Sequence, residues 1–567
     1  MAYLHEYDYI FALGLIFAFL DAWNIGANDV ANSFATSVSS RSLTMKQAML
    51  LASVCEFAGA VGVGARVADT IRSKIISTQF FAEDPAVLML GMMTALISSS
   101  IYLTFATRFG MPVSTTHSIT GGVLGMAIAA VGSKGVNWGW NGVSQVFAAW
   151  AIAPALAGAF GAIIFLVTKY TVMRRQNPVR AAFIMVPVYV AITTGILTML
   201  IVWKGAASAS STVAKWHAGE YVGVILGTAF GCALLSIVFL LPYLYRKLIL
   251  DDWQIRWYHI PLGPLVLRRG EVPPNESGRE VVQNYYRGHK TREELEAEGR
   301  DNIPVANDVE TQMQGGKEGK EGTTANASET NSADETATPL KETSKYSPSN
   351  LFFFAKRAFF HGVEVDVIAE QKKGSILTGN LEDMHARATH YDNKAEHMYS
   401  FLQVLTACTS SFVHGANDIS NACGPLASIY LIWSTAQLST KAPVPIWVLC
   451  YCAAALCIGL WTYGYNIMRN LGNRLTLHSP SRGFSMELGS AITVTMATRL
   501  ALPVSTTQCI TGATVGVGLT TGDWRAINWR MVAWIYGSWI ITLPITGIVS
   551  GCLMGIIINA PRFGLIE

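Results

Sequence analysis

The sequence predicts an all-α, multi-pass membrane protein built from two inverted repeats, with broken or re-entrant helices at the midplane. Three observations support this fold class. Of the 567 residues, 51% are hydrophobic and only 14% are charged. Apolar runs of about 18 or more residues recur along the chain, the length that a helix needs to cross a bilayer. Two short polar phrases each occur twice, in the same order and at nearly the same spacing.

The first repeated phrase is Gly-Ala-Asn-Asp, which occupies Gly26–Asp29 and returns as Gly415–Asp418, 389 positions later. The second is Pro-Val-Ser-Thr-Thr, which occupies Pro112–Thr116 and returns letter for letter as Pro503–Thr507, 391 positions later. The nearly equal offsets indicate an internal duplication. Each copy places an acid and several amides within apolar sequence.

About twelve apolar segments follow one another, seven before a long polar loop and five after it. The first seven lie near residues 9–29, 47–65, 86–107, 117–132, 143–170, 181–203 and 219–244. The other five lie near residues 398–416, 444–466, 484–500, 508–520 and 530–558. These segments divide the chain into an N-terminal transmembrane part with the first repeat, a loop, and a C-terminal transmembrane part with the second repeat, at residues 1–245, 246–395 and 396–567.

The loop at 246–395 differs in composition from its surroundings and holds about half of all Lys and Arg residues. Its middle, roughly 307–349, is low-complexity polar sequence that buries too little apolar surface to offset the entropy of ordering, so we expect disorder there. The aromatic and basic stretch near 350–365 predicts an amphipathic helix in the membrane interface. A soluble helix packed on the loop is the alternative.

Basic residues indicate the orientation in the membrane, because positively charged flanks stay cytoplasmic. They crowd both ends of the loop, at Arg246, Lys247, Arg256, Arg268, Arg269, Lys356 and Arg357. We therefore expect a cytoplasmic loop and, from the number of crossings on each side, extracellular N- and C-termini. The first copy then starts outside and the second inside, so the copies are inverted, as in secondary transporters.

The Gly-Ala-Asn-Asp phrase, called the acidic phrase below, has the chemistry of a cation site. An ionisable group within a membrane helix is costly unless it is paired or hydrated, so Asp29 and Asp418 are functional candidates. Glycine at positions 26 and 415 permits the backbone to leave helical geometry and to expose carbonyl groups there. Carboxylate, amide and carbonyl oxygens suit a hard cation such as sodium, whereas zinc or copper would favour His and Cys. Helix packing through Asn and Asp is the alternative.

The Pro-Val-Ser-Thr-Thr phrase, called the hydroxyl phrase below, has the chemistry of an anion site. Proline disfavours helix in the residue before it, and Ser and Thr are favoured N-caps, so a new helix should begin here, inside the membrane. The free N–H groups of such a helix start, together with the neighbouring hydroxyls, bind oxyanions. Two of these helix starts meeting at a pseudo-twofold axis would form an anion pocket without arginine.

The duplicated phrases resemble those of the PiT family of inorganic phosphate transporters, most closely its fungal sodium-coupled members. The similarity covers residues 1–245 and about 350–567. The resemblance implies sodium-coupled symport of inorganic phosphate across the plasma membrane by alternating access, with no enzymatic activity. It implies no cofactor, since the sodium ions are co-transported ligands, and it leaves a homodimer open as the assembly.

The resemblance also assigns roles to individual residues. It assigns phosphate binding to Ser114, Thr115, Thr116, Ser505, Thr506 and Thr507. It assigns sodium binding to Asn28, Asp29, Asn32, Asn417, Asp418 and Asn421. It assigns transport coupling to Glu56, Glu487 and His414, for which purely structural roles are the alternative.

Other functions fit parts of the pattern. Within the transporter class, the alternatives are proton coupling and a related oxyanion such as sulfate or arsenate. From another class, a phosphate-sensing receptor could signal through the long loop. An enzyme is disfavoured because the candidate residues include no nucleophile–base pair and no catalytic metal set. The formal net charge of +3 gives no indication of nucleic-acid binding.

Overall fold

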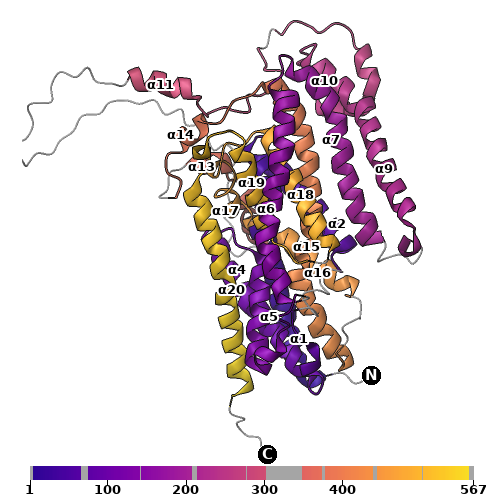
Figure 1. Ribbon diagram of the computed structural model, residues 1–567, viewed down its shortest axis with the longest axis vertical. Coiled ribbons are helices and arrows are strands. Elements are labelled where there is room, and N and C mark those ends of the chain that lie inside the picture. Colours follow the sequence, from indigo (N-terminus) through magenta and orange to yellow (C-terminus); the bar gives the residue numbers. More distant parts are fainter. Residues whose placement is uncertain are drawn as a thin grey trace, which may run out of the picture.

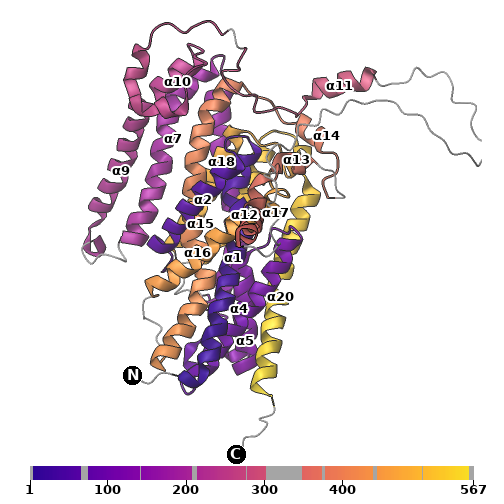
Figure 2. The same ribbon diagram turned by 180° about the vertical axis from the view of Figure 1, so that it is seen from behind.

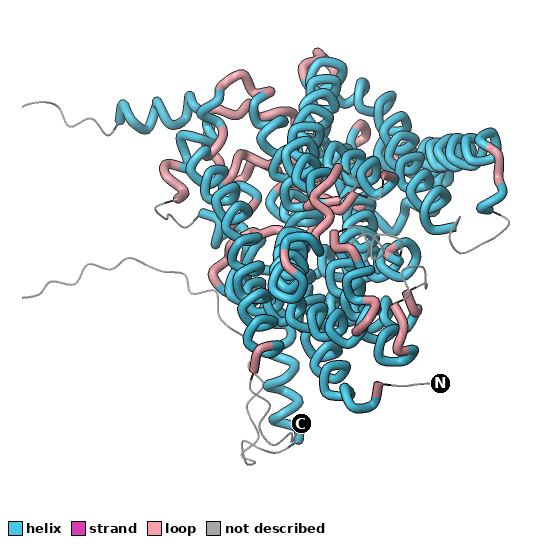
Figure 3. Tube along the Cα trace, turned by 60° about the horizontal axis from the view of Figure 1, so that its bottom comes forward, coloured by secondary structure: helices cyan, strands magenta, loops and turns pink. Residues whose placement is uncertain are grey.

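The computed structural model describes residues 4–65, 75–140, 142–206, 213–275, 278–301, 348–372, 377–438, 444–500 and 502–560. Within these ranges the chain is helical, and its only β-type pairing is a single bridge between Ile76 and Val136 (Figures 1 and 3). In the described part of the chain, eight helices are long and apolar enough to cross a membrane. The predicted all-α, multi-pass fold is therefore confirmed.

Each repeat consists of five helices. The first repeat comprises α1 (Asp8–Ser39), α2 (Met45–Val63), α4 (Pro85–Arg108), α5 (Thr115–Val131) and α6 (Val143–Thr168). The second comprises α15 (Asn393–Thr435), α16 (Ile446–Tyr463), α18 (Pro480–Arg499), α19 (Thr506–Leu519) and α20 (Trp529–Ile558). The remaining apolar helices are α7 (Pro178–Leu200) and α9 (Ala218–Leu235), which is followed by α10 (Leu241–Leu248). A short helix, α17 (Tyr465–Met468), follows α16.

The helices α5 and α19 are the shortest of the ten helices of the two repeats as the structure describes them. α5 has 17 residues and α19 has 14, whereas a spanning helix needs about 20. Both follow a buried segment that begins at Pro112 or Pro503, so they start in the interior of the molecule. They are the re-entrant helices of the predicted fold class, and the total of about twelve crossings stays a prediction.

The helices α1 and α15 run in opposite directions. At one end of the molecule, Trp433 near the end of α15 donates a hydrogen bond to Asp8 at the start of α1, at 2.7 Å. At the other end, Lys394 near the start of α15 donates to the carbonyl oxygen of Leu248 in α10, at 3.0 Å. The helices α10, α11 and α14 share this second end, whereas α1 begins and α20 ends at the first (Figures 1 and 2). The repeats are therefore inverted, and the side that faces the cytoplasm stays a prediction.

The two repeats interlock instead of packing as separate halves. The helix α1 packs on α16 of the other repeat, and α15 packs in the same way on α2. The re-entrant helices also pack on the opposite repeat, because α5 packs on α20 and α19 packs on α6. Each phrase-bearing helix is thus covered by a helix of the opposite repeat, and the two repeats share one core.

Glycines mark the crossings of the phrase-bearing helices. A Cβ atom at Gly26 would lie 2.0 Å from the carbonyl oxygen of Leu456, and one at Gly415 would lie 2.3 Å from that of Glu56. The backbone does not use the freedom that these glycines permit, because α1 and α15 run unbroken through both positions. The missing side chains instead let α16 and α2 approach to backbone contact.

The re-entrant helices also cross helices of the opposite repeat at glycines. A Cβ atom at Gly125 of α5 would lie 1.9 Å from the carbonyl oxygen of Gly547, and one at Gly516 of α19 would lie 2.2 Å from that of Gly158. Gly125 and Gly516 are 391 positions apart, the offset of the hydroxyl phrases. Equivalent positions of the two repeats therefore make equivalent contacts.

The described part of the loop contains η8 (Trp257–Arg268), α11 (Arg292–Asp301), α12 (Pro348–Glu364), α13 (Val367–Lys372) and α14 (Leu381–Ala386). The helix α12 covers the stretch near 350–365 and lies against α16 (Figure 2). Its Phe359 and Phe360 pack on Trp461, with ring centroids 6.3 and 5.6 Å apart. A position of α12 in the membrane interface stays a prediction. Most of the low-complexity stretch near 307–349 lies outside the described residues.

The glycine crossings can be tested within one helix. We expect Gly59→Ala to destabilise the protein, because its Cβ would lie 2.1 Å from the carbonyl oxygen of Phe412 in α15. A backbone atom cannot rotate away, so the expected loss is about 1–3 kcal/mol of unfolding free energy. Gly62→Ala in the same helix is the matched control, because nothing lies within 4 Å of its Cβ position. Thermal unfolding of the purified variants measures the difference, and equal melting temperatures would contradict the tight crossing.

Candidate functional site

The helices α1 and α15 bring the two acidic phrases together in the interior, where α5 and α19 begin. The side chains of Ser114 and Ser505 cap these helices by accepting the backbone N–H groups of His117 and Gln508, at 3.2 and 3.3 Å. The helix starts predicted at the hydroxyl phrases are therefore present. All twelve residues predicted to bind phosphate or sodium are at most 6% exposed. The site is enclosed by protein in this conformation.

The carboxylate of Asp29 accepts hydrogen bonds from both re-entrant helices. Thr115 of α5 donates to Oδ2 at 2.9 Å, and Thr507 of α19 donates to Oδ1 at 3.1 Å. The amide of Asn32, one turn further along α1, donates to the same Oδ1 at 3.1 Å. These three donors satisfy a carboxylate that has no contact with solvent.

The carboxylate of Asp418 has the mirrored environment. Thr506 of α19 donates to Oδ2 at 2.7 Å, and Thr116 of α5 approaches Oδ1 at 3.5 Å. The neighbouring amide of Asn417 donates to Oδ1 at 2.6 Å. Each repeat therefore supplies one carboxylate and also hydroxyl donors to the carboxylate of the other repeat.

Two asparagines tie the repeats together across the axis. Asn32 of α1 donates to Thr506 and Thr507 of the second repeat, at 3.2 and 2.9 Å. Asn421 of α15 makes the equivalent bonds, at 3.2 and 3.3 Å, to Thr115 and Thr116. The predicted cation and anion residues therefore form one continuous hydrogen-bonded cluster.

Asn28 and Asn417 contact the segments that precede the re-entrant helices. The Asn28 amide donates to the carbonyl oxygen of Met111 at 3.0 Å, and its oxygen accepts the N–H of Val113 at 3.2 Å. Asn417 donates to the carbonyl oxygen of Val504 at 3.0 Å. The side chain of Asn28 is thus engaged by backbone. The amide oxygens of Asn32 and Asn417 have no hydrogen-bond partner among the described residues.

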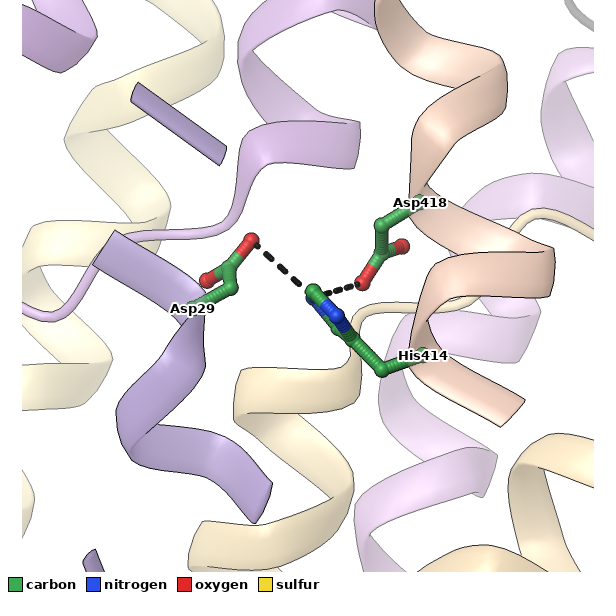
Figure 4. A group of neighbouring side chains, drawn as sticks. All are labelled: Asp29, His414 and Asp418. Atoms are coloured by element: carbon green, nitrogen blue, oxygen red, sulfur yellow. Dashed lines mark ion pairs between the residues drawn. The ribbon is translucent and has the colours of Figure 1, made fainter. Parts of the chain in front are cut away.

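His414 lies between the two aspartates (Figure 4). Its Nε2 is 2.9 Å from an oxygen of Asp418 and 3.7 Å from an oxygen of Asp29. Its Nδ1 is 2.7 Å from Oε2 of Glu56 on α2. Asp29, His414 and Asp418 each offer one ligand atom within 4.8 Å of the others, the spacing that a bound cation requires. The corresponding residue of the first repeat is Ile25, so the imidazole breaks the twofold symmetry.

Comparison with known proteins agrees with this geometry. Residues 25–550 match the Phosphate transporter family. The chain is 56% identical to the phosphate-repressible phosphate permease pho-4 of Neurospora crassa, with 99% of each chain covered. The chain belongs to the phosphate transporter family. The resemblance seen in the sequence is thereby confirmed.

Other relatives of this phosphate transporter family member are more distant. It is 28% identical to sodium-dependent phosphate transporter 1 of Mus musculus, over 97% of this chain and 96% of that protein. It also resembles a solved structure of a sodium-dependent phosphate transporter, with a TM-score of 0.64 and 23% identity. That likeness covers 97% of this chain and all of the other, and it supports the fold.

The two predicted coupling glutamates of this transporter lie in different environments. Glu56 belongs to the central cluster through His414. Glu487 of α18 forms a separate buried cluster beyond Asp29 toward the loop end. Its carboxylate accepts hydrogen bonds from Thr36, Ser37, Gln403 and Thr406. Thr36 is seven residues after Asp29 on α1, which places the two clusters about 10 Å apart along that helix.

His414 was predicted through the family resemblance, beside its position directly before Gly415. The residues around Glu487 were not among the predicted site residues. The hydroxyl and amide residues around Glu487 carry no motif, and they converge on α18 from α1 and α15. Their grouping depends on which helices pack together.

Proposed function

We propose that this transporter couples the uptake of inorganic phosphate to sodium by alternating access at the plasma membrane, without chemical conversion of its cargo. One observation carries the proposal: threonine hydroxyls at two inverted helix starts donate to a pair of buried aspartates. The names of relatives add support. They include a phosphate permease and sodium-dependent phosphate transporters.

Phosphate binding is proposed at the starts of α5 and α19. The first N–H groups of a helix lack intrahelical partners, and the positive end of the helix dipole favours an anion. Two such starts face one another, and hydroxyl groups line both of them. The proposed ligands are Ser114, Thr115, Thr116, Ser505, Thr506 and Thr507.

Sodium binding is proposed at the two acidic phrases. Carboxylate and amide oxygens are ligands that suit a hard monovalent cation. The unpartnered amide oxygens of Asn32 and Asn417 are available for this role. The proposed ligands are Asn28, Asp29, Asn32, Asn417, Asp418 and Asn421.

The hydrogen bonds between these two sets of residues offer a physical route to coupling. In this structure the hydroxyls of Thr115 and Thr506 direct their hydrogens to Asp29 and Asp418. A sodium ion on each carboxylate would replace those hydrogens as the source of positive charge. The hydroxyl hydrogens would then be free to donate to phosphate. Cation binding thereby creates the anion site, and phosphate binds poorly without sodium.

Proton coupling is the second candidate, and one contact favours it. One ring nitrogen of His414 contacts Glu56 and the other contacts Asp418. A proton on the imidazole would therefore offset part of the negative charge of these carboxylates. We propose that Glu56 and His414 couple ion binding to helix movement at the centre. We propose the same coupling role for Glu487, nearer the end of the molecule where the loop lies.

Imposed gradients distinguish the two coupling ions. We expect proteoliposomes containing the purified transporter to accumulate phosphate under an inward sodium gradient, because the ion supplies the driving force. A proton gradient alone should give little uptake. Radiolabelled phosphate measures accumulation, and empty liposomes are the control. Binding without accumulation would indicate a receptor instead.

Substitutions separate the roles of the acids and the hydroxyls. We expect Asp29→Asn or Asp418→Asn to weaken sodium binding by a few kcal/mol, on the order of the cost of an unmatched charge in a membrane protein. Added sodium should then partly restore phosphate uptake. Thr115→Val or Thr506→Val removes a donor and should weaken phosphate binding by about 1–3 kcal/mol. Sodium should rescue these variants much less.

The measurement is phosphate uptake as a function of sodium concentration, after surface expression has been confirmed. Thr193→Val is the matched control, because its hydroxyl donates only to the carbonyl oxygen of Tyr189 on α7. This variant should behave as wild type. If sodium rescues the threonine variants and not the aspartate variants, the two assignments are reversed.

A cytoplasmic loop and extracellular termini are proposed from the basic flanks of the loop. Two glycosylation sequons lie in the loop, at Asn275 and Asn326. We expect neither to carry sugar in cells, because glycosylation occurs on the opposite side of the membrane. Glycosidase treatment should leave the mass of the protein unchanged. A mass shift that is lost on Asn275→Gln or Asn326→Gln would reverse the orientation.

A further inference from the structure

A third aspartate lies on α1 and belongs to neither repeated phrase. Asp21 is eight residues before Asp29, which places it about 12 Å away along the helix, toward the end where α1 begins. Its side chain is 0% exposed. Neither carboxylate oxygen has a hydrogen-bond partner among the described residues. Asp29 and Asp418, by contrast, are each supplied with several donors.

The surroundings of Asp21 are rich in oxygen. Asn24, one turn further along the same face of α1, uses its amide nitrogen to donate to the carbonyl oxygen of Ser100 and the hydroxyl of Thr104 on α4, at 3.3 and 2.9 Å. This leaves the Asn24 oxygen buried and without a partner among the described residues. The hydroxyl of Ser99 on α4 faces the carboxylate, and it accepts a hydrogen bond from Ser118 at 2.9 Å.

No described basic side chain neutralises this carboxylate. The titratable groups that interact with it electrostatically include Asp29 on the same helix and Cys452 on α16, and neither carries positive charge. Burying an ionised carboxylate without a counter-ion is strongly unfavourable. The environment of Asp21 is therefore incomplete without a positively charged ligand.

We propose that Asp21, the side-chain oxygen of Asn24 and the hydroxyl of Ser99 form a further sodium site. Oxygen ligands of this type suit a hard monovalent cation and not a transition metal. The site lies between the end where α1 begins and the central cluster, so it holds a cation on the way to Asp29. The second repeat has Ser410 at the equivalent position, so this site occurs in one repeat only.

Sodium binding to the purified protein in phosphate-free buffer tests the proposal directly. We expect Asp21→Asn and Asp21→Ser each to bind one sodium ion fewer than wild type, as measured with radiolabelled sodium. Glu6→Gln, which removes an exposed acid just before α1, is the matched control and should bind the wild-type number. An unchanged number in the Asp21 variants overturns the proposal. So does a change confined to the pH dependence of stability, because the carboxyl group would then hold a proton.

A second variant keeps the proposal testable if the Asp21 variants misfold. Ser99→Ala leaves the carboxylate in place and removes one ligand, so the apparent sodium affinity should fall about fivefold or more. A wild-type affinity in this variant overturns the proposal even if the Asp21 variants cannot be purified. The binding assay needs no phosphate and no gradient. Failure of sodium-driven uptake would therefore refute the proposed function without bearing on this site.

Discussion

Two carboxylates enclosed within a membrane protein have to be satisfied without bulk water, and the fold is arranged around this requirement. The interior of a continuous helix has no spare backbone donors, because its N–H groups are already bonded. Donors are available where a helix begins, from its first N–H groups and its capping hydroxyls. Asp29 and Asp418 therefore depend on two helices that start at the centre of the molecule. This explains why α5 and α19 are short and why each contributes to both carboxylates.

The same requirement explains why the repeats interlock. Each acid needs hydroxyls from both re-entrant helices, so α1 and α15 have to lie side by side at the axis. Glycines make this packing dense, because Gly26 and Gly415 allow helices of the opposite repeat to reach backbone contact. The pairs α5–α20 and α19–α6 follow the same rule at Gly125 and Gly516. Small residues serve helix packing in membranes, where hydrophobic driving force between helices is weak.

The cluster is symmetric in its aspartates, threonines and asparagines, and asymmetric in the groups around them. His414 has an isoleucine as its counterpart, and Asp21 has a serine. In inverted-repeat transporters, the two repeats exchange conformations as the site opens to one side or the other. The symmetric contacts can form whether the site opens to one side of the membrane or to the other. Asp21 and His414 have no counterpart of the same type in the other repeat, so they make the two sides of the site different. The asymmetric residues are therefore suited to give ion binding its direction along α1.

The sequence alone determined the membrane class, the duplication and the inversion, and it located the two polar phrases that meet in the central cluster. These properties are local, because apolar length, repeated words, basic flanks and helix-capping residues are all read within short segments. The tertiary structure decided that Gly26 and Gly415 are crossing points and not breaks, and that His414 lies between the aspartates. It also decided that Glu56 joins the central cluster while Glu487 lies apart from it. These outcomes depend on contacts between residues hundreds of positions apart, and only the packing of one helix against another determines them.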